Sequence, residues 1–243
     1  MKTITDIFQF LKKPDFEPIQ DKSRNKIKLF FVIFLWLLLI WYVMNFLINI
    51  VEFFLFGHPT RPDMTLDHIN PGNGWYLFQL ILLGPIIEEF SCRYALGRFN
   101  LNKIKISLSL IISFYISYFL YVYKFRELCG SNYIWHFLIL HGTMLSVATI
   151  LFFATNLLNK QIALFENKWN KYFPIIFYLY AILFAIYHFN MPTRFIFFYF
   201  TGALFFGYTR IRLGFGYVIA LHMLWNSLTA LAAWAHSLLK DQL

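Results

Sequence analysis

Charged residues are scarce in this chain. They make up 14% of its 243 residues, whereas about one quarter is usual for a soluble domain. Hydrophobic residues account for 59% and aromatic residues for 22%. This balance excludes an ordinary soluble domain and predicts an all-α fold, a polytopic transmembrane helix bundle that forms one domain. Although the net charge is +9, we expect no nucleic-acid binding, because Lys and Arg in such a chain fix its topology.

Cysteine and the common catalytic motifs are also lacking. The two cysteines, Cys92 and Cys129, have no motif spacing, which argues against a disulfide framework or a cysteine zinc site. The chain has neither a Gly-x-Ser-x-Gly nucleophile elbow nor the His-Glu-x-x-His zinc-protease motif. No fixed-period repeat or low-complexity linker divides it.

Residues 1–28 form a basic N-terminal segment that we expect to be cytoplasmic. They lack an apolar core segment, so we expect no cleavable signal peptide, and the first span must act as its own insertion signal. Ile4, Ile7, Phe8 and Leu11 share one helical face. This pattern is typical of an amphipathic helix on the membrane surface. A mobile tail with accidental spacing is an equal alternative.

Hydropathy predicts about seven spans within a bundle over 29–243. A span needs about 20 mostly apolar residues. The predicted spans are 29–56, 75–97, 106–123, 132–158, 171–189, 194–209 and 214–236. Gly- and Pro-rich residues 57–74, residues 124–131 and the polar segment 159–170 are predicted loops, and Met191-Pro192 turns the chain.

Charge predicts the orientation of these spans. With a cytoplasmic N-terminus, fifteen of the 21 Lys and Arg residues face the cytoplasm and five face outward, while Arg93 stays within the bundle. The positive-inside rule therefore predicts that the N-terminus is cytoplasmic and the C-terminus is outside.

Three ionisable residues stand close together in the second predicted span. Glu88, Glu89 and Arg93 lie where a charge is costly and is a functional hypothesis by default. Glu89 and Arg93 are four residues apart, so they share a helical face and can pair. Glu88 is rotated by about 100° and faces something else. Gly84-Pro85 just before them predicts a kink or a helix restart.

Further polar residues lie in later spans. His188 ends the fifth span, and taken alone it is as often an interfacial residue as a functional one. His222 and Asn226 are four residues apart in the seventh span, so both point into the bundle, where an interhelical hydrogen bond is the simpler explanation. His136 and His141 share no face well, and we expect structural or interfacial roles for them.

Together these residues resemble the CPBP intramembrane protease family, which includes the Ras-converting CAAX prenyl endopeptidases and the bacterial Abi proteins. Its Glu-Glu-x-x-x-Arg motif is matched at 88–93, its Phe-x-x-x-His motif at 184–188, and its His-x-x-x-Asn motif at 222–226, with Gly207 before it. Each motif is loose alone, but three in order on predicted spans are specific. The resemblance covers about 75–98 and 172–236, where a CPBP-like catalytic core is expected.

The match departs from the family pattern in two places. Leu204 stands where the family has a Phe three residues before Gly207, a position that we interpret as packing. The first two motifs are also far apart, so the third and fourth spans are interpreted as an inserted pair. With the predicted boundaries, His188 lies near the outer end of its span while Glu88 lies nearer mid-depth.

The resemblance implies an enzyme, an intramembrane endopeptidase of the glutamate type. It implies that Glu88 with His188 holds and activates water. It also implies that His222 and Asn226 form the oxyanion hole. No cofactor is expected.

The resemblance assigns Glu89 and Arg93 a supporting role in the fold of the site. Metal dependence is left open. If zinc is present, Glu88, His188 and His222 would supply three ligands and leave a fourth position open. Asn226 and the single-His motifs favour a metal-free mechanism.

The expected partners are the lipid bilayer and a membrane-embedded or membrane-associated polypeptide substrate. No sequence feature indicates recognition of a prenyl group, so CAAX substrates are not implied. A composition rich in Phe, Ile, Lys and Asn suggests an AT-rich bacterial genome, and the expected location is a bacterial inner membrane. Two rival functions remain open: a non-catalytic scaffold or bacteriocin-immunity factor on the same fold, and a small proton-coupled transporter, which the lack of repeat symmetry makes the weakest.

Overall fold

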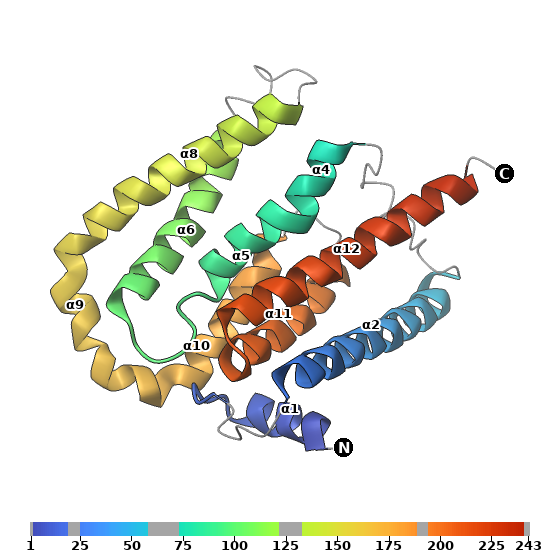
Figure 1. Ribbon diagram of the computed structural model, residues 1–243, viewed down its shortest axis with the longest axis horizontal. Helices are drawn as coiled ribbons and strands as arrows, with labels where there is room; N and C mark the ends of the chain where they lie inside the picture. The colour runs from blue at the N-terminus through green and yellow to red at the C-terminus, as the bar shows by residue number, and fades with distance from the viewer. Residues whose placement is uncertain (1, 19–24, 58–72, 122–132, 189–193, 241–243) are drawn as a thin grey trace.

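The computed structural model describes residues 2–18, 25–57, 73–121, 133–188 and 194–240. Within them every regular element is helical, which confirms the all-α class. In chain order the elements are α1 (Lys2–Lys12), α2 (Lys26–Phe56), α4 (Gly74–Phe78), the π-helix η1 (Gln79–Leu83), α5 (Gly84–Cys92), α6 (Leu101–Leu120), α8 (Tyr133–Ala154), the 3-10 helix η3 (Thr155–Leu158), α9 (Asn159–Leu164), α10 (Glu166–Tyr187), α11 (Arg194–Arg212) and α12 (Phe215–Lys240). Figure 1 shows α5 between the α6–α8 pair on one side and α12 on the other.

Five helices in the described part of the chain are long and apolar enough to cross a membrane. They are Lys26–Leu55, Leu101–Leu120, Ile134–Leu164, Glu166–Ile186 and Phe215–Leu238. The predicted span at 75–97 is helical only to Cys92 and is divided into α4, η1 and α5, each shorter than 18 residues. The predicted span at 194–209 is α11, which is not among the five. Seven spans and a cytoplasmic N-terminus therefore stay predictions.

Some predicted features fall where the structure gives no description. Most of the predicted loops at 57–74 and 124–131 lies outside the described residues, as do the Met191-Pro192 turn and Cys129. The other cysteine, Cys92, is buried and free.

Asparagine caps place the starts of three helices. The side chain of Asn25 accepts hydrogen bonds from the backbone of the first turn of α2, Asn73 does so for α4, and Asn100 for α6. An N-cap oxygen satisfies one of the amide groups that lack an intrahelical partner. As a result α2 and α6 begin before the predicted boundaries at 29 and 106, because capping and not hydropathy decides where a helix starts.

The predicted loop at 159–170 is wrong. The chain is helical through α9, and α10 begins at Glu166, with only Phe165 between them. The segment is polar, but it contains neither Gly nor Pro and is rich in good helix formers. Its polarity reflects solvent exposure of a helix and not a break in one.

The N-terminal amphipathic helix is present, but part of its apolar face packs against the bundle. Ile7 and Phe10 are buried. The Phe10 ring meets the edges of Phe177 in α10 and Tyr208 in α11, with ring centroids 5.2 and 5.3 Å apart. The Tyr208 hydroxyl donates a hydrogen bond of 2.6 Å to Asp6. The mobile-tail interpretation is therefore wrong for this helix, and its position on the membrane surface stays a prediction.

The outer surfaces of the long helices are apolar. In α2 the side chains of Leu35, Phe46 and Phe54 are exposed, as expected of a helix that faces lipid. Lys105, expected just before a span, is instead buried in α6, where its ammonium group contacts Asn156 and the Phe152 ring. A buried charge needs such partners.

Candidate active site

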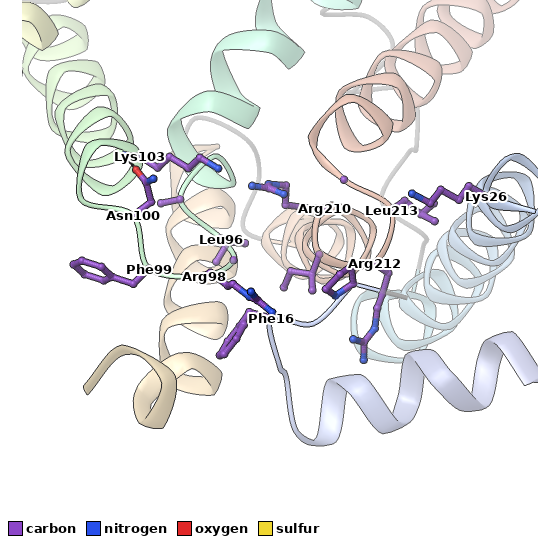
Figure 2. Close-up of a pocket in the computed structure, with 15 residues that line it drawn as sticks. Phe16, Lys26, Leu96, Arg98, Phe99, Asn100, Lys103, Arg210, Arg212 and Leu213 are labelled. Atoms are coloured by element: carbon purple, nitrogen blue, oxygen red, sulfur yellow. Dashed lines mark hydrogen bonds between the residues drawn. The ribbon is translucent and has the colours of Figure 1, made fainter. Parts of the chain in front are cut away.

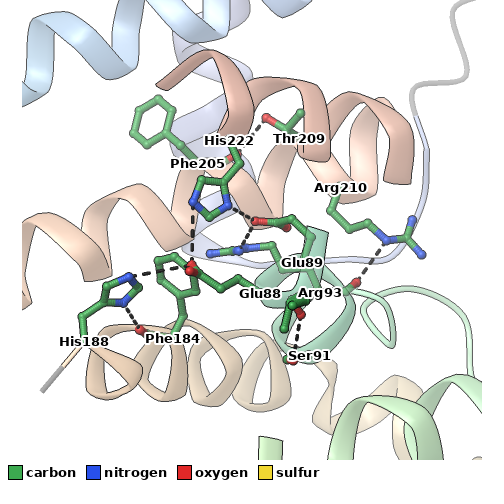
Figure 3. Close-up of polar contacts among 11 residues, drawn as sticks. Glu88, Glu89, Ser91, Arg93, Phe184, His188, Phe205, Thr209, Arg210 and His222 are labelled. Atoms are coloured by element: carbon green, nitrogen blue, oxygen red, sulfur yellow. Dashed lines mark hydrogen bonds and ion pairs between the residues drawn. The ribbon is translucent and has the colours of Figure 1, made fainter. Parts of the chain in front are cut away.

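Three helices bring the candidate residues together. Glu88 and Glu89 lie in α5, His188 directly follows α10, and His222 lies in α12. Both α10 and α12 pack against α5. Figure 3 shows both histidine rings pointing toward the Glu88 carboxylate. The site is therefore built by packing between segments that are distant in the sequence.

The helical hydrogen-bond pattern leading to Glu88 changes at the predicted Gly84-Pro85 break. Pro85 has no N–H and cannot donate to the carbonyl of Ile81 as an α-helix requires. The preceding turn widens into the π-helix η1, in which the amide of Gly84 bonds to the carbonyl of Gln79. The helix restarts as α5 with Pro85 in its first turn, which confirms that prediction. Single π turns are frequent at functional sites.

Asn226 compensates for this break. The carbonyl of Leu80 has no backbone donor, because the amide of Gly84 serves Gln79 and Pro85 has none. The side-chain Nδ2 of Asn226 donates a hydrogen bond of 2.8 Å to that carbonyl. A buried carbonyl without a partner would be costly. The hydrogen bond of Asn226 therefore links α12 to the π turn. Asn226 itself lies one helical turn after His222 in α12.

Glu89 connects Arg93 to His222. Its Oε1 accepts from Nη1 of Arg93, and the Nδ1 of His222 lies 2.8 Å from the same oxygen. All three side chains are buried, and Glu89 is fully so. The pairing of Glu89 with Arg93, predicted from their spacing, is confirmed. The contact with His222 was not predicted, and it makes Glu89 a neighbour of the candidate catalytic groups.

Glu88 lies between the two histidines. Its Oε2 is 3.7 Å from Nε2 of His188 and 3.7 Å from Nε2 of His222. This oxygen is buried and makes no hydrogen bond within the described residues. The predicted mismatch in depth between Glu88 and His188 is wrong, because the two side chains approach to 3.7 Å although His188 lies at the end of α10, close to the predicted end of its span.

Hydrogen bonds at Nδ1 orient both rings. The Nδ1 of His188 lies 2.9 Å from the carbonyl of Phe184, which can only accept. The Nδ1 of His222 faces the Glu89 carboxylate, which when ionised also only accepts. Both Nδ1 atoms therefore carry a proton, and both rings present Nε2 to Glu88. This assignment follows from the partners and not from observed hydrogens.

Aromatic rings enclose the buried charges. The guanidinium of Arg93 lies 4.0 Å from the centroid of the Phe184 ring and 5.0 Å from that of Phe206. Tyr199 stacks on His188, with centroids 3.8 Å apart and planes 13° from parallel. Cation–π contact stabilises a desolvated cation. Phe184 therefore makes two contacts in the site. Its ring lies against the guanidinium of Arg93, and its carbonyl faces the Nδ1 of His188.

Sequence reasoning missed several of these neighbours. Tyr199, Phe206 and Arg210 all lie in α11, where no motif marked them. Arg210 donates from Nε to the carbonyl of Arg93, at 3.1 Å, and from Nη2 to that of Tyr94, at 3.3 Å. The one available signal was Arg210 itself, a cation directly after the predicted span at 194–209, a position for which the positive-inside rule is a sufficient explanation.

Gly207 allows α10 and α11 to approach closely. A Cβ atom at this position would lie 2.6 Å from Cε2 of Phe177, closer than packed atoms come. Leu204, the departure from the family pattern, is partly buried and packs against the core. Both observations agree with a packing role for this part of the third motif.

Two further histidines, His136 and His141, lie in α8. His136 contacts the Tyr121 hydroxyl, and His141 lies against the Phe137 ring and carbonyl. Among the described residues, no group of three or more His, Cys, Asp or Glu side chains is arranged to hold a metal ion. Glu88, His188 and His222 converge but do not form such a group.

Comparison with known proteins gives one match. A family model described as type II CAAX prenyl endopeptidase Rce1-like matches residues 70–228, more than half of the chain. The matched region contains all three motifs and also α6 and α8. No curated protein and no solved structure gives a significant match.

Proposed function

This chain belongs to the Rce1-like type II CAAX prenyl endopeptidase family, and we propose that it is an intramembrane endopeptidase with Glu88 as its general base. The five long apolar helices among its described residues, together with its family, make it an integral membrane protein. The family acts on membrane-associated polypeptides, and the substrate proposed for this chain is of that class. The proposed location is a bacterial inner membrane.

The observation that carries the proposal is the convergence on one carboxylate oxygen. The Oε2 of Glu88 is buried, makes no hydrogen bond among the described residues, and faces the Nε2 atoms of His188 and His222 at 3.7 Å. Separations above 3.5 Å between polar atoms are ones that a bridging water can complete. A water between Glu88 and His188 would be held by two acceptors and aimed at a substrate.

The proposed reaction begins with proton transfer to Glu88. As the carboxylate takes a proton from this water, the water oxygen attacks the carbonyl carbon of the scissile peptide bond. The product of this step is a tetrahedral intermediate with a negative charge on the former carbonyl oxygen. Glu88 then returns the proton to the departing nitrogen, so that one water is consumed and an acid and an amine are released.

His222 is the proposed main donor to the oxyanion. Its Nδ1 is held by Glu89, so a ring that carries both protons donates from Nε2. The positive charge of such a ring would be balanced, because Glu88, Glu89 and Arg93 together carry one excess negative charge. A donor fixed in advance in a dry site is worth more than one in water.

Asn226 is the proposed second donor. One hydrogen of its Nδ2 is used by the Leu80 carbonyl, and a side-chain amide has two. The second hydrogen is the one assigned to the oxyanion. The contact with Leu80 would fix the direction of that second hydrogen.

No step of this proposal runs through a metal, because Asn226 and the single-His motifs favour a metal-free mechanism. Zinc held by Glu88, His188 and His222 is the alternative that elemental analysis decides. No prenyl group is assigned to the substrate either, because the described residues give no reason to require one.

A substrate trap tests the proposal. Purified Glu88→Gln protein should retain a polypeptide that wild-type protein releases as two fragments. The matched control is Glu52→Gln, the same substitution at a carboxylate in α2. We expect the retained polypeptide to be cleaved by wild-type and Glu52→Gln protein alike. Failure of wild-type protein to cleave any retained polypeptide would contradict the proposal.

A further inference from the structure

A second candidate site is a cavity at the end of the bundle that carries α1. It encloses about 530 Å³, within the range of about 300–1,000 Å³ that is usual for ligand pockets. Its walls are the chain after α1, the start of α2, the loop between α5 and α6, and the turn between α11 and α12. Figure 2 shows these four segments around it. None of the candidate catalytic side chains lines it.

Positive charge dominates this cavity. Five cations line it: Lys26, Arg98, Lys103, Arg210 and Arg212. Two of them are neutralised by carboxylates of the chain after α1. Arg98 pairs with Glu17 at 3.3 Å, and Arg212 with Asp15 at 2.7 Å.

The other three cations have no carboxylate partner among the described residues. Arg210 is held at the wall by the carbonyls of Arg93 and Tyr94, which fix its guanidinium without neutralising it. The ammonium group of Lys103 lies over the Tyr94 ring. Figure 2 shows Lys103 extending toward Arg210. The cavity therefore keeps an excess of three positive charges that come from α2, α6 and α11.

Two glycines with positive φ angles lie in the wall of the cavity. Gly97 and Gly214 both line it and have φ angles of +143° and +118°, which side-chain-bearing residues rarely adopt. A Cβ atom at Gly214 would meet nothing within 4 Å, and one at Gly97 would meet only the guanidinium of Arg210, at 4.0 Å. Both turns thus bring backbone to the cavity without filling it.

The positive-inside rule explains why cations gather at this end of the helices. It does not explain why three of them line one cavity without a carboxylate partner in the part of the chain that the structure describes. Basic pockets between membrane helices bind phosphate head groups, and Arg is well suited to phosphate oxygens. We propose that this cavity binds the phosphate group of an anionic ligand through Lys26, Lys103 and Arg210.

Two sources could supply this phosphate, a lipid head group or a soluble phosphorylated molecule. A phosphate from either source would join three elements that are far apart in the chain, α2, α6 and α11. Because the ligand would bind the folded state alone, it would raise the melting temperature by an amount that grows with the logarithm of its concentration above the dissociation constant.

The test measures binding by full-length purified protein in neutral detergent. Phosphatidic acid and glycerol 3-phosphate are titrated separately while the melting temperature is followed, with phosphatidylcholine as the reference lipid. The cavity variant is Lys26→Gln with Lys103→Gln. The matched control is Lys28→Gln with Lys168→Gln, which removes two cations outside the cavity. Lys26→Arg with Lys103→Arg shows whether the positions tolerate change.

We expect saturable binding of one probe, about 30-fold weaker in the cavity variant, since each cation contributes roughly a factor of five. The control and the arginine variant should bind about as wild type.

Binding of phosphatidic acid alone identifies a lipid head group, and binding of glycerol 3-phosphate identifies a soluble ligand. Saturable binding of neither probe, or equal loss in the cavity variant and the control, would overturn the proposal. Peptidase activity enters none of these outcomes, so the proposed function is tested separately.

Discussion

The Nδ1 of His222 lies 2.8 Å from Oε1 of Glu89, an oxygen that also accepts from Arg93. One buried carboxylate therefore fixes a histidine ring and neutralises a guanidinium at the same time. The arrangement resembles the carboxylate partners that orient histidines in many active sites. Its consequence is that adjacent glutamates act differently: Glu89 sets the direction of His222, and Glu88 meets the Nε2 atom so presented.

Replacing Glu89 tests this relationship. In Glu89→Gln, Arg93 becomes a buried charge without a carboxylate, which typically costs about 3–5 kcal/mol. We expect a lower melting temperature and peptidase activity reduced by about 10- to 100-fold. The matched substitution Glu52→Gln in α2 should change neither quantity. Wild-type stability and activity in Glu89→Gln would show that neither partner depends on the carboxylate.

The link between Asn226 and Pro85 gives a double-mutant test. Asn226→Leu leaves the Leu80 carbonyl without a donor, at a cost of about 1–3 kcal/mol. Pro85→Ala restores an N–H that can close the backbone ladder. We therefore expect the double variant to recover much of the stability lost in Asn226→Leu, as measured by thermal melting. Strictly additive losses would mean that the π turn and Asn226 are independent.

Gly207 provides a packing test. In Gly207→Ala the new Cβ would lie 2.6 Å from Cε2 of Phe177, so the helices must separate or the ring must move. We expect a loss of about 1–3 kcal/mol, typical of overpacking. Gly202→Ala is the control in the same helix, because its Cβ would meet nothing within 4 Å, and it should be neutral or stabilising. Equal melting temperatures for the two variants would contradict the close approach.

Sequence patterns predicted the local geometry of the site well. The four-residue spacing of Glu89 and Arg93 and the Gly84-Pro85 break depend only on neighbouring residues, and both are confirmed. The contacts of His222 with Glu89 and of Asn226 with Leu80 depend on how α12 packs against α5. No periodicity within either segment carries that information.

Helix ends were predicted less well, for identifiable reasons. The predicted loop at 159–170 failed because polar residues were interpreted as a break, although the segment contains no helix breaker. The starts of α2 and α6 were placed too late because hydropathy ignores the capping residues Asn25 and Asn100. The docking of α1 depends on Tyr208 and Phe177, which lie far along the chain.

Elemental analysis tests the metal alternative. If zinc is held by Glu88, His188 and His222, protein purified without chelator should contain near-stoichiometric metal, and His188→Ala should lose it. The metal-free account predicts active protein with no stoichiometric metal and activity that survives chelator treatment. If the protein contains stoichiometric zinc and removal of the zinc abolishes activity, Glu88 is not the sole activator of water.

The central claim is that Glu88 is the general base, and the most direct measurement compares turnover of one polypeptide by wild-type, Glu88→Gln and Glu52→Gln protein. A general base contributes about 10²- to 10⁴-fold, so we expect a loss of that size in Glu88→Gln, with the melting temperature preserved. Glu52→Gln should keep wild-type turnover. Undiminished turnover in Glu88→Gln would contradict the account, and full biological activity in both Glu88→Ala and His222→Ala would favour a non-catalytic scaffold instead.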